Sequence, residues 1–195
     1  MNTSKKSQST QNKVLDAALR CYERDGLNHV NMQEIAAEAS IGRTTLYRHF
    51  SNQEEVLAQV ARRDILKMVD SIQACLDQQN CLEDKIVEGL MFCIDSFSNS
   101  PVLSLLLQPE SVNLLIELGI NTEAMNQTGA ELTHPIYAEA QQSGRLRSNI
   151  SLTDFVEWVT RILISFQASP GKFQNKPDAL REFLHKLLVP SLLNT

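Results

Sequence analysis

The sequence predicts an all-α protein with a small N-terminal domain of three helices, a long connecting helix and a larger C-terminal helical domain. Apolar residues recur at helical spacing through most of the 195 residues. No stretch alternates as a strand does, and no internal repeat is present. Capping residues and Gly/Pro turns divide the helical stretches. We expect a flexible basic arm at residues 1–11, the small domain at 12–51 and the larger domain at 52–195.

Composition limits the class of protein. The chain is 43% hydrophobic, which supports a folded core, yet it contains no apolar run long enough to span a membrane. The first residues are polar, with Lys5 and Lys6, and resemble neither a signal peptide nor a membrane segment. The cysteines lack CxxC spacing, so we expect free thiols in a reducing cytoplasm and no metal or other cofactor. They are Cys21, Cys75, Cys81 and Cys93.

The charge is unevenly distributed along the chain. The net charge is −5, which argues against a generally basic nucleic-acid binder. Residues 1–50 hold seven Lys/Arg against five Asp/Glu, whereas residues 51–195 hold eleven against eighteen. The N-terminal segment therefore carries +2 and the remainder −7. The polar arm at residues 1–11 fits either a segment that lies along a DNA backbone or an idle terminus.

Apolar residues at helical spacing and capping residues at the helix ends predict the first two helices. Residues 13–25 carry two apolar stripes and end at Asp25-Gly26, a typical C-cap. Asn31 and Glu34 form the Asn version of a capping box, which starts the next helix. The following apolar residues are mostly small and let another helix approach closely. They are Met32, Ile35, Ala36 and Ala39.

A short helix after the Ser40–Gly42 turn has the composition of a DNA recognition helix. Gly42 occupies the N-cap position, while Leu46 and Phe50 share the inward face. The opposite face offers hydroxyl and guanidinium groups of the size that phosphates and base edges accept. A solvated amphipathic helix is the alternative interpretation. The polar set is Arg43, Thr44, Thr45, Tyr47, Arg48 and His49.

The stretch IAAEASIGRTTLYRHFSNQEEVL resembles the DNA-binding motif of the TetR family of transcriptional regulators, including its Ile-Ala pair and Leu-Tyr-x-x-Phe run. The resemblance covers residues 12–61 by motif and the remainder only by length and helical character. It implies a homodimer whose N-terminal domains bind palindromic operators and whose C-terminal domains bind a ligand that usually releases the DNA. The chain departs from the family at Ser40, usually glycine, and at Gln53, usually lysine; a contact from Gln53 to phosphate would lack charge assistance.

The remaining helices follow from further signals. We expect a helix from Ser51, capped by Glu54, to Leu76, and a kink at Pro135 in a helix over residues 121–143. Ser151 with Asp154 caps another helix. The other predicted helices are 82–97, 101–119 interrupted at Pro109, 151–168, and a last helix from Pro177 to about Pro190.

The last two helices are apolar on more than one face, which favours a homodimer over a single monomeric core. The expected interface consists of Phe155, Val159, Ile162, Phe166, Leu180, Phe183, Leu184 and Leu187. Aromatic, thioether and polar side chains near the Pro135 kink are candidates for binding a largely apolar effector, although most fit a core equally well. They are His134 and Tyr137 first, then Met68, Met91, Phe92, Phe97 and Trp158. Arg161 fits an anionic ligand less well than an acidic partner at the dimer surface.

We weigh three functions from these residues. The first is a cytoplasmic, homodimeric repressor that is not an enzyme and that a small molecule releases from double-stranded DNA. In it, the polar set of residues 43–49 enters the major groove while Asn31, Gln33, Ser51, Asn52 and Gln53 hold the DNA backbone. The second is a helical ligand- or partner-binding module without specific DNA binding. The third is a di-iron enzyme, suggested by two Glu-x-x-His pairs, Glu131/His134 and Glu182/His185, although Glu182 is predicted to face water.

Overall fold

The computed structural model describes residues 2–27, 29–106 and 123–194, and within these ranges the regular structure is helical apart from one antiparallel bridge between Leu146 and Leu193. The chain divides into two compact units. Unit 1 comprises Met1–Leu66 and Ser100–Leu118, and unit 2 comprises Lys67–Asn99 and Gly119–Thr195. The helix α6 (Pro101–Leu106) was predicted to belong to the larger domain, whereas it contacts α1 (Asn2–Asp25) of unit 1.

The helices of unit 1 are α1 (Asn2–Asp25), α2 (Met32–Glu38), α3 (Arg43–His49), the first part of α4 (Gln53–Leu76) and α6 (Pro101–Leu106). Unit 2 contains the rest of α4, α5 (Leu82–Asn99), α8 (Glu123–Gln142), α9 (Leu152–Ala168), the 3-10 turn η2 (Gly171–Phe173), α10 (Pro177–Leu187) and α11 (Val189–Leu192). Pro109, the predicted interruption, lies outside the described residues.

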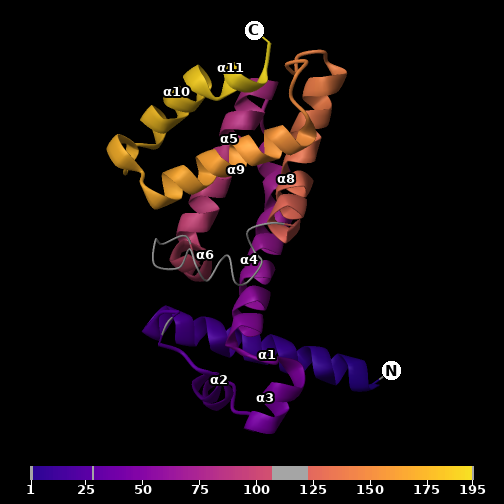
Figure 1. Ribbon diagram of the computed structural model, residues 1–195, viewed down its shortest axis with the longest axis vertical. Coiled ribbons are helices and arrows are strands. Elements are labelled where there is room, and N and C mark those ends of the chain that lie inside the picture. Colours follow the sequence, from indigo (N-terminus) through magenta and orange to yellow (C-terminus); the bar gives the residue numbers. More distant parts are fainter. Residues whose placement is uncertain (1, 28, 107–122, 195) are drawn as a thin grey trace. The chain divides into compact units, whose positions relative to one another are not determined.

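In unit 1, α2 packs against both α1 and α3 (Figure 1). The capping box that starts α2 is confirmed, since Asn31 Oδ1 accepts from the N–H of Gln33 at 2.9 Å and of Glu34 at 3.1 Å. Gly42 caps α3 as predicted. Tyr22 of α1 and Leu46 of α3 are fully buried, so the apolar face of each helix lies inside unit 1.

Two helix starts differ from the predictions. Helix α1 begins at Asn2, so the predicted start near Lys13 was wrong, and residues 2–11 continue the helix instead of forming a separate arm. The cap of α4 lies one residue later than predicted. Asn52 Oδ1 accepts from the N–H of Glu55 at 2.8 Å, while the Glu55 carboxylate accepts from the N–H of Ser51 at 2.6 Å. The pair Asn52/Glu55 therefore replaces Ser51/Glu54.

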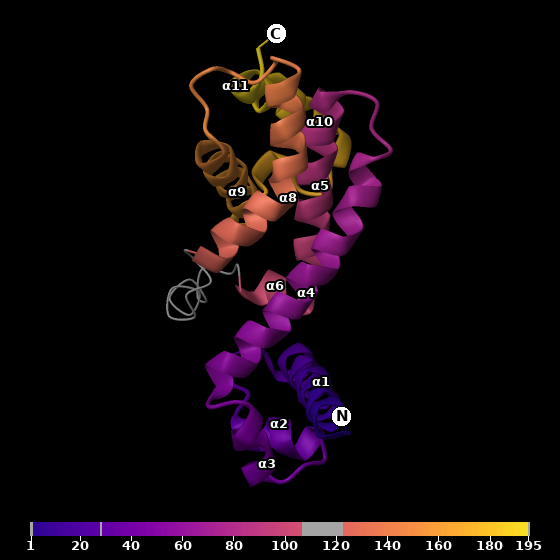
Figure 2. The same cartoon turned by 90° about the vertical axis from the view of Figure 1, so that its right-hand side faces the viewer.

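Unit 2 is arranged around α5, which packs against α8, α9 and α10 (Figure 2). Phe155 of α9 is 1% exposed, and Gly129 allows α8 to approach that helix, since a Cβ at Gly129 would lie 2.9 Å from Val156 Cγ1. The capping box of Ser151 and Asp154 is confirmed, as is the start of α10 at Pro177. Helix α8 runs through Pro135.

Candidate nucleic-acid interface

Helix α3 presents a polar face. Tyr47 is 53% exposed, although aromatic side chains of this size are usually covered. Arg43, Thr44 and Arg48 are exposed as well, whereas Leu46 and Phe50 are buried at 0% and 3%. The predicted division of this helix into an inward and an outward face is therefore confirmed.

The two arginines of α3 are electrostatically available. Neither Arg43 nor Arg48 forms an ion pair within the described parts of the chain. Two other arginines of unit 1 are paired: Arg20 Nε lies 2.7 Å from Glu38 Oε1, and Arg63 Nη1 lies 2.5 Å from Asp16 Oδ1. The Arg20 hydrogen bond also holds the pKa of the Glu38 carboxyl below its ordinary value. Positive charge on α3 is thus left for an external anion.

Three of the predicted backbone anchors also hold the domain together. The Oδ1 atoms of Asn31 and Asn52 accept the capping bonds already described, which leaves their Nδ2 groups as the free donors. Gln53 Nε2 donates to the carbonyl of Leu27 at 3.1 Å and so joins the start of α4 to the turn after α1. Gln33 and Ser51 are exposed. The bond from Gln53 joins positions 26 apart and has no local sequence signal.

The other two predicted contact residues are partly covered. Thr45 is half-buried on α3. His49 is also half-buried, and its Nε2 is shielded from solvent without a hydrogen-bond partner among the residues that the structure describes. That nitrogen faces the domain interior, so in this conformation it offers nothing to a ligand outside.

The turn before α3 places a serine in the left-handed backbone region. Ser40 has φ +52°, and Ile41 N–H donates back to the carbonyl of Ala36 at 3.0 Å. Glycine adopts this conformation without steric cost, whereas an L residue pays for it. This chain therefore has a serine, in place of the family's usual glycine, at a position whose backbone conformation favours glycine.

Comparison with known proteins bears on this geometry. The model of the family described as bacterial regulatory proteins, tetR family, matches residues 14–60, which include all of α2 and α3. The N-terminal domain is a TetR-family helix-turn-helix domain. An HTH-type transcriptional regulator of Staphylococcus aureus (strain USA300) is 30% identical over 61 residues, which are 31% of this chain. The chain spans only 33% of that relative's length in the match.

Solved structures extend the likeness to the full TetR-family fold. A TetR-family transcriptional regulator from Pectobacterium atrosepticum has a TM-score of 0.74 at 18% identity, covering 100% of this chain and 99% of that one. The transcriptional regulator FadR from Bacillus subtilis, in complex with stearoyl-CoA, has a TM-score of 0.67 at 16% identity, covering 91% and 96%. Unit 2 therefore belongs to the helical fold that accompanies TetR-family DNA-binding domains.

The seven residues suggested for effector binding do not converge on one place. Met68 and Phe97 are buried in the core, and His134 is exposed. Tyr137 donates its hydroxyl to the carbonyl of Ile150 at 3.3 Å and stacks edge-on against Phe155. Phe92 is half-buried, Trp158 is 44% exposed, and Met91 lines a cleft. The other residues that line this cleft were not predicted to bind an effector, because they come from separate helices.

The predicted dimer residues fall into two groups. Phe155, Leu180 and Leu184 are buried in the protomer's own core, at 1%, 6% and 1% exposure, so they have no surface to offer a partner. Leu187 is 54% exposed, and the remaining four are half-buried. They are Val159, Ile162, Phe166 and Phe183. Periodicity identified apolar faces but did not distinguish an internal face from an external one.

The Glu-x-x-His pairs do not form a metal site among the described residues, and Arg161 has a partner within its own helix. Glu131, His134 and Glu182 are exposed, and His185 Nε2 lies 3.3 Å from Asp84 Oδ1. The described residues contain no group of three or more His, Cys, Asp or Glu side chains that could hold a metal. Arg161 pairs with Glu157 one turn earlier in α9. No helix in the described ranges is both long and apolar enough to cross a membrane.

Proposed function

We propose that this chain is a sequence-specific DNA-binding transcriptional regulator. The observation that carries the proposal is the outward face of α3, where exposed Arg43 and Arg48 lack an ion-pair partner in the described structure and flank an exposed Tyr47. Hydrated cations and an uncovered aromatic ring suit a surface that meets phosphates and base edges. The TetR-family match over residues 14–60 supports the same use.

In this proposal α3 enters the major groove of double-stranded DNA and the ends of α2 and α4 touch its backbone. The groove residues are Arg43, Thr44, Thr45, Tyr47 and Arg48, and His49 joins them only through atoms other than its covered Nε2. The residues proposed to contact the DNA backbone are Asn31, Gln33, Ser51 and Asn52. The side-chain Nδ2 groups of Asn31 and Asn52, which the capping bonds do not use, serve as donors. Gln53 is a weaker candidate, because its Nε2 already donates to Leu27.

We further propose a homodimer that binds a palindromic operator as a repressor and leaves it when a small molecule binds unit 2. Two-fold symmetry of the protein would be mirrored in the operator. Trp158 and Leu187 are exposed apolar side chains of unit 2, which suits burial against a second copy. The stearoyl-CoA complex of the Bacillus subtilis regulator supports a largely apolar effector.

The test is selection from random duplex DNA with the purified full chain, followed by fluorescence anisotropy of the selected duplex across a salt series. A palindromic duplex bound about 10³-fold or more tighter than a scrambled one is the expected result. The affinity should fall steeply with salt, as phosphate contacts require. Binding that is weak and indifferent to sequence would instead indicate a ligand- or partner-binding module.

Substitutions on α3 test the assigned face. Tyr47→Ala and Arg48→Ala should each weaken operator binding by roughly 1–3 kcal/mol, because each removes a base or charged phosphate contact. Lys172→Ala, which removes an exposed cation of unit 2 away from the proposed DNA contacts, serves as the control and should bind as the wild type does. Circular dichroism and ultracentrifugation check that fold and assembly are retained. Unchanged affinity in both α3 variants would disprove the assignment.

A further inference from the structure

Unit 2 contains a cleft of about 310 Å³ that the proposed DNA contacts do not use. It lies between α5, the end of α9, the turn through η2 and the start of α10. Its volume is at the lower end of the range for small-molecule sites and equals about ten water volumes. The lining residues are Met91, Ile94, Asp95, Ser98, Phe166, Gln167, Pro170, Phe173, Gln174, Asn175, Lys176, Pro177 and Leu180.

The helices give the cleft an apolar wall. Phe166 and Phe173 meet edge to face with ring centroids 5.8 Å apart, and Leu180 is 6% exposed beside the start of α10. Met91 and Ile94 add a thioether and a branched chain from α5. Such a wall favours an aromatic or branched aliphatic group of a ligand.

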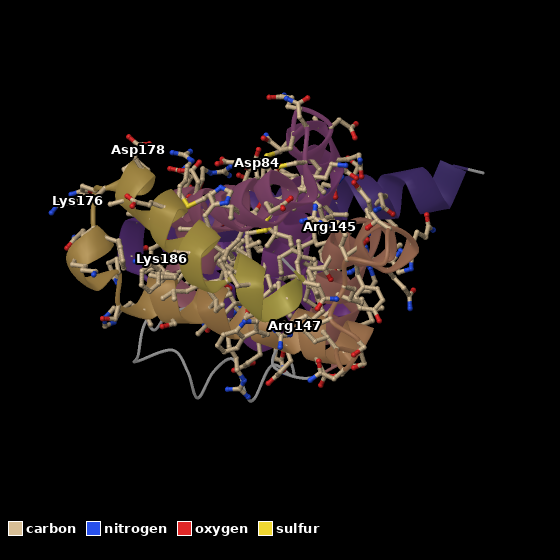
Figure 3. The ribbon with its side chains drawn as sticks, turned by 90° about the horizontal axis from the view of Figure 1, so that it is seen from above. Asp84, Arg145, Arg147, Lys176, Asp178 and Lys186 are labelled. Atoms are coloured by element: carbon tan, nitrogen blue, oxygen red, sulfur yellow. The ribbon has the colours of Figure 1, made fainter. Side chains whose placement is uncertain are left out.

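Unpaired polar groups stand around this apolar wall. Asp95 on α5 and Lys176 before α10 form no ion pair with any residue that the structure describes. The side-chain amides of Gln174 and Asn175 likewise form no hydrogen bond there. Figure 3 shows Lys176 at the outer edge of unit 2, beside the start of α10. The residues that line the cleft therefore include one acidic and one basic side chain without an ion-pair partner in the described structure, on different elements.

The other polar neighbours are already engaged. Ser98 Oγ lies 2.9 Å from the carbonyl oxygen of Ile94 and 3.3 Å from Gln167 Oε1, and can donate to either, while Gln167 Nε2 donates to the carbonyl of Ile94. The nearby Lys172 ammonium lies 5.1 Å from the ring centroid of Phe173 and 5.8 Å from that of Phe183. These contacts leave Asp95 and Lys176 as the charges that line the cleft and are available to a ligand.

We propose that this cleft binds a small zwitterion with an apolar body, of the α-amino-acid type. A purely cationic ligand would meet Asp95 favourably and Lys176 unfavourably, and a purely anionic ligand the reverse. A molecule with both charges gains from both side chains while its apolar group covers Phe166 and Phe173. The free amides of Gln174 and Asn175 supply donors and acceptors to the same polar end. The inference concerns unit 2 alone and does not depend on the DNA-binding proposal.

The experiment is a titration of the full-length protein, labelled with ¹⁵N, followed by NMR. L-Phenylalanine is the probe, compared with 2-phenylethylamine, which lacks the carboxylate, and 3-phenylpropanoate, which lacks the amine. L-Phenylalanine should shift the amide signals of residues 171–176 with a dissociation constant of about 0.1–1 mM. Each analogue should bind roughly three- to ten-fold more weakly, because it loses one partly exposed ion pair and meets one like charge.

Matched variants assign the two charges. In Asp95→Asn, L-phenylalanine should bind no better than 3-phenylpropanoate, and in Lys176→Gln no better than 2-phenylethylamine. Glu182→Gln and Lys186→Gln change exposed charges on α10 that do not line the cleft, and they should keep the wild-type affinities. Equal binding of the three compounds, no shift of the amide signals of residues 171–176, or charge variants that behave as the wild type would overturn the proposal. Operator binding, measured separately, reports on the DNA proposal.

Discussion

Ser40 carries a conformational cost in the turn between α2 and α3. Its φ of +52° lies in the left-handed region, and its side chain is exposed. We expect Ser40→Gly to raise the free energy of unfolding by about 0.5–1 kcal/mol, since relief of the backbone strain exceeds the entropy gained by the unfolded chain. Urea denaturation followed by circular dichroism measures the change. Gly26→Ala, at φ +77°, should shift stability in the opposite direction; a destabilised Ser40→Gly would show that the hydroxyl matters more than the strain.

Tyr22 buries a hydroxyl that finds no hydrogen-bond partner among the described residues. The side chain is 0% exposed, and its burial raises the pKa of the phenol above the ordinary value of 10. Tyr22→Phe keeps the ring and removes the unsatisfied oxygen, so we expect the free energy of unfolding to rise by about 1 kcal/mol. Thermal and urea unfolding provide the measurement. A loss of stability of similar size would mean that the hydroxyl is satisfied in solution.

At the scale of elements, an ion pair joins the first turn of α5 to the segment after α8. Arg145 Nη1 donates to Glu83 Oε2 at 3.1 Å, and Arg145 Nη2 makes a second bond to Glu83 Oε1. The hydrogen bond from Arg145 is the main reason that the pKa of Glu83 falls from 4.5 to about 2. The folded state therefore binds the proton more weakly than the unfolded state does, and the pair stabilises folding above pH 4.5.

The corresponding variant is Glu83→Gln. A shift of this size, counted fully, is about 3 kcal/mol, but both side chains are roughly one-third exposed, so we expect a loss of about 1 kcal/mol at pH 7. As the pH falls from 4.5 towards 2, Glu83 becomes protonated and the difference between wild type and variant should disappear. Urea midpoints at pH 7, 4 and 3 test this. Glu182→Gln, an exposed carboxylate on α10, is the control; a difference that does not change with pH would contradict the expected linkage.

At the scale of the whole molecule, exposed apolar side chains of unit 2 bear on assembly. Trp158 Nε1 donates to Ser191 Oγ at 2.9 Å while 44% of the residue stays exposed, and Leu187 is 54% exposed. If these side chains contact a second copy, Trp158→Glu and Leu187→Glu should raise the dimer dissociation constant at least about ten-fold, because each places an unpaired charge in the interface. Analytical ultracentrifugation measures the constant. Leu66→Glu, at an exposed apolar position of unit 1, should leave it unchanged; a matching loss there would point to a general effect of added charge.

The sequence by itself determined features that depend on neighbours within about one helical turn. Asn31 caps α2, Ser151 caps α9, and Leu46 and Phe50 turn inward while Tyr47 turns outward. These follow from backbone donors that need a nearby acceptor and from the helical period. The helix-turn-helix could therefore be predicted with its family. The start of α1 was not, because a polar N-terminal segment offers no apolar stripe to mark a helix.

Only the tertiary structure decided which apolar side chains are buried and which charged side chains are paired. Periodicity treated Leu184 and Leu187 alike, yet the first is 1% exposed and the second 54%. The hydrogen bond from Gln53 to Leu27 connects residues far apart in the sequence. Asp95 and Lys176, which both line the cleft, are also far apart in the sequence. A pattern records that a face is apolar or that a charge exists, whereas burial and pairing depend on which other helix arrives beside it. That choice belongs to the packing of the whole chain.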